Sequence, residues 1–108
     1  MAFGLSDTDL QRIRAACREF PQIREVLIFG SRAMGNYKRG SDVDLALKGR
    51  IDHATVTALS ARLNEELPLP YLFDVVDYHA MTRPELQTHI DRYGKILYAA
   101  DDLSTDSS

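Results

Sequence analysis

The stretch that decides the predicted fold runs from Leu27 to Leu47 and reads LIFGSRAMGNYKRGSDVDLAL. Its first residues belong to an apolar run, 26–29, of the β-branched and aromatic types that strands favour. The run stops at Gly30-Ser31, where glycine permits a sharp turn and serine is a preferred helix N-cap. After a basic, glycine-dotted span, Asp42-Val43-Asp44 marks the start of a second strand. The stretch therefore predicts two strands joined by a turn and one short helical turn over 31–34.

The second strand begins with two acids. Because side chains alternate between the faces of a strand, Asp42 and Asp44 are predicted to share one face, opposite the apolar residues between and after them. Two carboxylates held this close repel each other, and hard cations such as Mg²⁺ prefer carboxylate oxygens. The pair therefore predicts a divalent metal site.

The link between the two strands is basic. Arg32, Lys38 and Arg39 follow the Gly30-Ser31 turn, whose backbone N–H groups, with the start of the short helix, favour an anion. The alternative for each of the three basic residues is an ordinary solvated loop position, because loops are commonly charged.

Composition restricts the class of protein. The chain has 108 residues, 44% of them hydrophobic and 27% charged, which predicts one soluble domain with a single core. We place that domain at 1–100 and expect the acidic stretch 101–108, DDLSTDSS, to be disordered. The net charge of −3 argues against direct nucleic-acid binding.

The cellular compartment is predicted from what the sequence lacks. No apolar run approaches the roughly 18 residues of a membrane-spanning helix, and Met1 opens no signal-peptide pattern. The single cysteine, Cys17, cannot form an internal disulfide, which favours a reducing compartment. We therefore expect a cytoplasmic protein with no membrane partner. Cys17 has helical spacing with Leu10 and Ile13, so we interpret it as a small buried hydrophobe and not as a nucleophile.

Caps and breakers place the remaining elements. Ser6, Asp52 and Thr82 are predicted N-caps of three helices, and Pro84 lies in the first turn of the last one. The predicted elements are helices over 6–20, 52–67 and 82–93, and strands near 25–30, 43–48, 72–77 and 96–98.

A third acid, Asp74, lies inside the third predicted strand between apolar neighbours. An unpaired buried charge is costly, so this carboxylate needs a partner, and a shared metal would supply one. Asp77 lies three residues later, and the pleat therefore predicts it on the opposite face, as a solvated or turn-forming acid. The histidines are not at ligand spacing, and we expect no zinc site from His53, His79 and His89.

Together, Gly30-Ser31, ten intervening residues and Asp42-Val43-Asp44 resemble the signature of nucleotidyltransferases of the DNA polymerase β type. The short chain, with GSRAMG, SDVDLAL and FDVVDY in that order, looks like the minimal nucleotidyltransferases (MNT proteins) of that superfamily. The resemblance extends from the first helix to about Tyr98. It agrees with an α/β fold: a small, mixed, twisted sheet with helices mainly on one face and the acids on the opposite, open face.

The resemblance also implies roles for the site residues. In such enzymes two aspartates on one strand bind two Mg²⁺ ions, and a third carboxylate on a neighbouring strand binds one of them. Here these catalytic and metal-binding residues would be Asp42, Asp44 and Asp74, with Mg²⁺ or Mn²⁺ as the metal. Asp74 would also help to remove the proton of the acceptor hydroxyl. The implied nucleotide-binding residues are Gly30, Ser31, Arg32 and Ser41.

The partners implied are ATP or another NTP, and a HEPN-domain protein encoded nearby. MNT proteins typically act as antitoxins of HEPN-domain toxins, and in this family can do so by transferring AMP to a toxin tyrosine. Two alternatives stay open. The chain could neutralise its partner by occlusion without catalysis, or it could be a nucleotidyltransferase of small molecules, against which the lack of an acceptor-binding domain argues.

Overall fold

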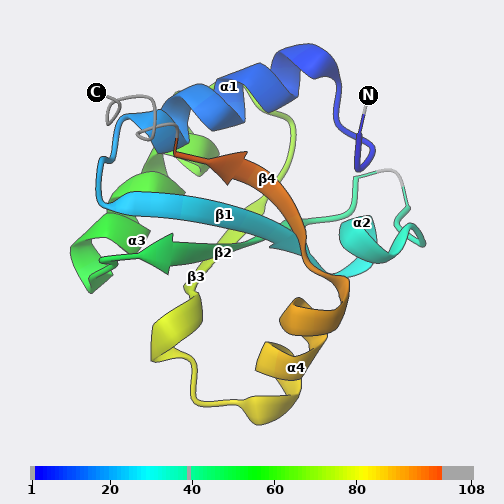
Figure 1. Cartoon of the computed structure of the whole chain (residues 1–108). Helices are drawn as coiled ribbons and strands as arrows, with labels where there is room; N and C mark the ends of the chain where they lie inside the picture. Colours follow the sequence, from blue (N-terminus) through cyan, green and yellow to red (C-terminus); the bar gives the residue numbers. More distant parts are fainter. Residues whose placement is uncertain (1, 39, 101–108) are drawn as a thin grey trace.

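The four strands form one sheet in the order β3-β2-β1-β4 (Figure 1). The structure is a computed structural model that describes residues 2–38 and 40–100, so Arg39 and the tail predicted at 101–108 lie outside the described residues. The strands are β1 (Ile23–Phe29), β2 (Val43–Gly49), β3 (Phe73–Asp77) and β4 (Lys95–Ala99). β1 is antiparallel to β2 and β4, whereas β2 and β3 are parallel. The mixed sheet is confirmed, and β3 and β4 are its edges.

The helical elements follow the predicted order. They are α1 (Asp7–Arg18), α2 (Ser31–Met34), α3 (His53–Ala61), the π-helical turn η1 (Arg62–Glu66), the 3-10 turn η2 (Tyr78–Ala80) and α4 (Pro84–Tyr93). No helix in the described part of the chain has the length and apolar character needed to cross a membrane.

Two of the three predicted caps are confirmed. The Ser6 hydroxyl accepts a hydrogen bond from the Asp9 N–H at 3.1 Å, and the Asp52 carboxylate accepts one from the Thr55 N–H at 2.8 Å. The predicted Thr82 cap is wrong: Arg83 precedes the first helical residue and makes no side-chain cap. The helix begins directly at proline because its ring fixes φ near the helical value and it has no N–H to be capped.

Helices cover the two faces of the sheet unequally. The larger core lies between the sheet and the α1, α3 and η1 helices, and includes Ile13, Cys17, Ile28, Leu45, Leu47, Leu59 and Leu63. A smaller cluster on the other face packs Ile90 of α4 against Leu27, Phe29 and Ala46. Figure 1 shows α1 above the sheet and α4 below it. Helices therefore lie mainly on one face, as expected, but the opposite face is only partly open.

The buried cysteine behaves as predicted. Cys17 is fully buried in the larger core, and burial raises the pKa of its thiol to about 12. A thiol that stays protonated at neutral pH is a poor nucleophile, so its role is packing.

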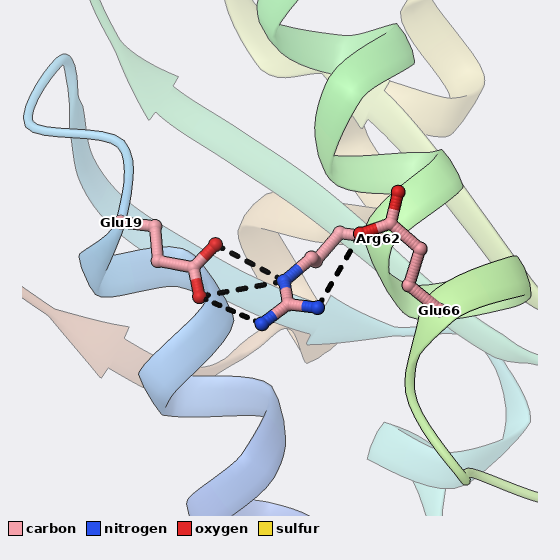
Figure 2. Close-up of polar contacts among 3 residues, drawn as sticks. All are labelled: Glu19, Arg62 and Glu66. Carbon is pink, nitrogen blue, oxygen red and sulfur yellow. Dashed lines mark hydrogen bonds and ion pairs between the residues drawn. The ribbon is translucent and has the colours of Figure 1, made fainter.

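A half-buried arginine connects two helical elements of the larger layer, α1 and η1 (Figure 2). Nε and Nη2 of Arg62 in η1 donate to the carboxylate of Glu19, which follows α1, with the shortest contact at 3.0 Å. Nη1 of the same side chain donates to Glu66 at 3.3 Å. Because these groups are partly exposed to solvent, the ion pairs contribute little to stability, but they hold the end of α1 against η1.

Candidate functional site

The register of three neighbouring strands aligns the candidate acids. Phe29, the last residue of β1, pairs with Asp44 of β2, and Asp44 pairs with Asp74 of β3. Side chains of directly paired residues share one face of a sheet. Asp44 and Asp74 therefore lie side by side on the face that α4 partly covers, beside the turn that follows β1 at Gly30.

The three carboxylates differ in exposure. Asp44 is half-buried, whereas Asp42, which immediately precedes β2, and Asp74 are both exposed. The prediction that Asp74 is a buried charge is therefore wrong. β3 is an edge strand, so its face beyond α4 is open to water, and this carboxylate needs no partner to offset burial.

The acids interact electrostatically. Burial raises the pKa of Asp44, and the negative charges of Asp74 and Asp42 raise it further, whereas the electrostatic effects of His89 and then of Arg32 oppose the shift. Like charges disfavour the ionised form of a carboxyl group. The free protein thus holds three carboxylates in mutual repulsion at one edge of its sheet.

The chemistry of these donors suits a hard divalent cation. Carboxylate oxygens are the ligands that Mg²⁺ prefers, and a cation would relieve the repulsion that raises the pKa of Asp44. Across the ranges 2–38 and 40–100, however, no three His, Cys, Asp or Glu side chains are gathered closely enough to hold a metal ion. The carboxylates would have to reorient to bind one together.

The Gly30 turn lies directly against Asp44. Gly30 has φ +75°, and a Cβ atom at this position would overlap the Asp44 carboxylate. Glycine is thus required here for two reasons, the left-handed backbone and the space that the acid occupies. Ser31, the first residue of α2, is half-buried, and no side-chain hydrogen bond of its hydroxyl is found within the described residues.

Arg32 is a buried brace and not a solvated loop residue. Its side chain is 3% exposed, and Nε and Nη2 donate to the Ser41 carbonyl at 3.1 and 2.8 Å, while Nη1 donates to the Phe3 carbonyl at 2.8 Å. The rings of Tyr37 and Tyr71 lie 5.2 and 5.1 Å from the guanidinium carbon. These contacts fix α2 to the segment before β2, and they occupy the guanidinium with protein groups instead of leaving it free for a nucleotide.

Ser41 is likewise part of the connection. Its hydroxyl accepts a hydrogen bond from the Lys38 N–H at 2.9 Å, and its carbonyl is held by Arg32. Lys38 is exposed, as the solvated-loop alternative predicted for it.

We expect Arg32→Lys to lower the free energy of unfolding by about 1–3 kcal/mol, because a lysine cannot donate to the part-buried carbonyls of Ser41 and Phe3 at once. Urea denaturation measures the change. The exposed Arg12 of α1 supplies the matched control, Arg12→Lys, for which we expect a change within about 0.5 kcal/mol. Equal losses in the two variants would show that Arg32 is no brace.

Two residues of the site were missed by sequence reasoning. The His89 ring accepts a hydrogen bond from the Gly30 N–H at 3.0 Å, although 59 positions separate them. Asn64 of η1 bonds both backbone groups of Phe73: its Oδ1 accepts from the N–H at 2.8 Å and its Nδ2 donates to the carbonyl at 3.1 Å. Asn64 thereby steadies the residue before Asp74. No local pattern predicted the contact of His89 with Gly30, because it joins elements 59 positions apart. The contact of Asn64 with Phe73 spans nine positions, but it depends on how η1 packs beside β3.

A comparison with known families finds one match that spans almost the whole described chain. Residues 11–103 match the family described as polymerase beta, nucleotidyltransferase. All of the candidate site residues lie within this range. No curated protein matches the chain in sequence.

Solved structures with the same fold include chains of toxin–antitoxin complexes. One, a toxin–antitoxin complex with AMP-PNP, is 23% identical with a TM-score of 0.70, over 90% of this chain and 78% of that one. A chain of the MntA–HepT toxin–antitoxin is 19% identical with a TM-score of 0.66, over 93% and 78%. A chain of the tri-AMPylated Shewanella oneidensis HEPN toxin in complex with MNT antitoxin is 20% identical with a TM-score of 0.63, over 89% and 74%. At such identities the likeness establishes the fold.

Proposed function

We propose that this chain, which belongs to the polymerase beta nucleotidyltransferase family, transfers a nucleotide from an NTP, AMP from ATP in the first place, to a hydroxyl group of a partner protein. The observation that carries this proposal is the alignment of Phe29, Asp44 and Asp74 across three neighbouring strands, which places the Gly30 turn directly beside the two acids. A phosphate-binding turn and two carboxylates that repel each other are the parts that a metal-dependent phosphoryl transfer requires.

The residues divide the work by position. Asp42, Asp44 and Asp74 would hold two Mg²⁺ ions or Mn²⁺, and such ions neutralise charge on the triphosphate and on the leaving pyrophosphate. The Gly30-Ser31 turn would bind phosphate oxygens through the Ser31 hydroxyl and backbone N–H. Arg32 and Ser41, implied as nucleotide ligands, would contribute indirectly, because their contacts fix the turn to the segment before Asp42.

In the proposed reaction the acceptor hydroxyl oxygen attacks the α-phosphorus, and the bond between that phosphorus and the bridging oxygen of pyrophosphate breaks. Asp74 is exposed at the sheet edge, so its carboxylate can meet an acceptor from outside and take the hydroxyl proton. The reaction then depends mainly on positioning and charge neutralisation.

The proposed acceptor is a HEPN-type toxin, which the chain would neutralise as an antitoxin. Support comes from the fold shared with chains of a HEPN toxin–MNT antitoxin complex and of a toxin–antitoxin complex with AMP-PNP. One observation favours the alternative, neutralisation by occlusion: within the described residues no three metal-ligating side chains are gathered in advance.

Incubation of the chain with ATP labelled at the α-phosphate, Mg²⁺ and the proposed partner, a HEPN-type protein, tests the proposal. We expect the label to move onto a hydroxyl side chain of that protein, because a large acceptor supplies the binding contacts that orient its own hydroxyl. Gel autoradiography and mass spectrometry measure the transfer.

The variant Ser31→Ala with Asp44→Asn is the control, since it removes a phosphate ligand and a metal ligand together. We expect it to transfer no label and to lose neutralisation of the partner. If the variant neutralises the partner as well as the unmodified chain does, and neither transfers label, occlusion is the mechanism.

A further inference from the structure

One hydrogen bond joins α4 to the candidate phosphate-binding turn. The Gly30 N–H donates to Nε2 of His89 at 3.0 Å. A backbone N–H can only donate, so Nε2 is the acceptor and the ring carries its hydrogen on Nδ1. The contact consumes the backbone donor at the point where β1 turns into α2.

The His89 ring is held on the side of the sheet that carries the acids. Its edge packs on Phe29, with ring centroids 6.2 Å apart and planes at 73°, and its other neighbour is Tyr93, with centroids 5.3 Å apart. The next residue, Ile90, is 1% exposed and anchors α4 in the smaller core. The acceptor atom is thus fixed relative to β1, and not on a loose side chain.

The turn needs such a restraint. Gly30 has φ +75°, and glycine changes its backbone conformation easily because it has no side chain. The carboxylate of Asp44, on the adjacent strand β2, lies against it. A different orientation of the Gly30 peptide would move Ser31 relative to Asp44. The hydrogen bond to His89 selects one orientation before any ligand arrives, which lowers the ordering cost of binding.

We propose that His89 is a positioning residue for the nucleotide: by accepting the Gly30 N–H, it holds the Gly30-Ser31 turn beside Asp44 in the orientation that receives the triphosphate. This inference rests on the proposed nucleotidyltransferase function. It assigns the phosphate contacts to Ser31 and leaves the Gly30 N–H out of them, because His89 already occupies that donor.

Two substitutions separate the hydrogen bond from the packing of the ring. His89→Phe keeps an aromatic ring between Phe29 and Tyr93 and removes the acceptor, whereas His89→Gln places an amide oxygen close to the position of Nε2. His79→Phe is the matched control: it is the same replacement at an exposed position of η2 whose backbone N–H is bonded to Asp77. Thermal unfolding of each variant establishes that it is folded.

Two measurements follow on each protein: amide hydrogen exchange at Gly30 by NMR in the free chain, and calorimetric binding of AMP-PNP with Mg²⁺. In His89→Phe we expect exchange at Gly30 to accelerate about tenfold or more, and the Kd to rise about tenfold, as for loss of one hydrogen bond. In the transfer assay KM for the nucleotide rises while kcat stays within about twofold, since positioning in the ground state is what changes. His89→Gln should restore Kd to within about threefold, and His79→Phe should match the unmodified chain.

Several results would overturn the inference. If amide exchange at Gly30 is unchanged in a folded His89→Phe variant, His89 does not restrain the turn. If the Kd for the nucleotide is unchanged, the restraint plays no part in nucleotide binding. A Kd in His89→Gln as high as in His89→Phe assigns the effect to packing. If the unmodified chain binds no nucleotide, the proposed function fails and this inference fails with it. If the unmodified chain binds nucleotide and His89→Phe binds it equally well, only this inference fails.

Discussion

Replacement of Asp44 by asparagine is expected to lower the rate of nucleotide transfer by about a thousandfold or more. Asparagine keeps the size of the side chain but removes the charge that would hold the metal, and loss of a metal ligand costs several kcal/mol of transition-state stabilisation. The labelled-ATP assay measures the rate. Calorimetry should also show that Mg²⁺ no longer strengthens ATP binding in the variant that combines Asp42→Asn with Asp44→Asn. If this variant and the unmodified chain bind Mg²⁺–ATP with equal affinity, the two acids are not part of the site.

The same substitution should stabilise the free protein at neutral pH. The pKa of Asp44 is raised in the folded state, by burial first and then by Asp74 and Asp42. Well below its unfolded pKa of about 3.9, the carboxyl is protonated in both states and does not reduce the free energy of unfolding. As pH rises through the folded pKa, ionisation favours the unfolded chain and this stability is lost. Urea unfolding without divalent cations should therefore find Asp44→Asn more stable than the unmodified chain at pH 7, with the difference vanishing near pH 3. A less stable variant at pH 7 would contradict the repulsion.

Asp74 and Asp77 provide the comparison within one strand. Asp74→Asn is expected to lose transfer as Asp44→Asn does, because Asp74 is aligned with Asp44. Asp77→Asn should keep most of the activity, since its carboxylate accepts a hydrogen bond from the His79 N–H and so caps η2. If Asp77→Asn loses activity and Asp74→Asn keeps it, Asp77 and not Asp74 is the site residue of β3.

Gly30→Ala is expected to lower transfer at least about a hundredfold. The new methyl group would overlap the Asp44 carboxylate, so either the acid or the turn must move. A misplacement of about 1 Å in an active site costs about a hundredfold in rate. With φ +75° and ψ −154°, Gly30 lies in a backbone region that is essentially open only to glycine, so alanine adds a backbone cost of about 1–3 kcal/mol. The transfer assay and urea unfolding measure the two effects separately.

Gly35→Ala is the matched control for Gly30→Ala. Gly35 ends α2 with φ +85° and ψ 3°, which is the left-handed helical region, whereas Gly30 has φ +75° with ψ −154°. A Cβ atom at Gly35 meets nothing within 4 Å. We expect the alanine at Gly35 to lose about 1 kcal/mol of stability through its backbone, less than the alanine at Gly30, and to change transfer little. If both variants lose activity equally, backbone strain in this segment and not contact with Asp44 is responsible.

Local patterns predicted most of the elements and the face of β2 on which Asp44 lies. Alternation placed Asp44 on the face opposite Leu45, and polar caps at Ser6 and Asp52 marked the starts of two helices. These features depend on residues a few positions apart, which is why a single sequence reveals them. The family match agrees with the resemblance seen in the Gly30-Ser31 and Asp42-Val43-Asp44 motifs.

The sequence could not predict what depends on distant pairing. Whether Asp74 is buried depends on the order of the strands, and its alignment with Asp44 depends on the register set after the crossover through α3 and η1. The charge of Arg32 indicated a ligand contact or a solvated loop, whereas its partners are backbone carbonyls and two aromatic rings brought together only by folding. The contact of His89 with Gly30 has the same origin.

The side chain of Asn64 has a consequence for how the protein behaves in concentrated solution. An edge strand can recruit a strand from another molecule through its unpaired N–H and carbonyl groups, which is a common route to aggregation. At Phe73 the Asn64 amide already bonds both groups, as a neighbouring strand would. An incoming strand would first have to break these two hydrogen bonds. Asn64 therefore disfavours the addition of a strand from another molecule at the start of β3.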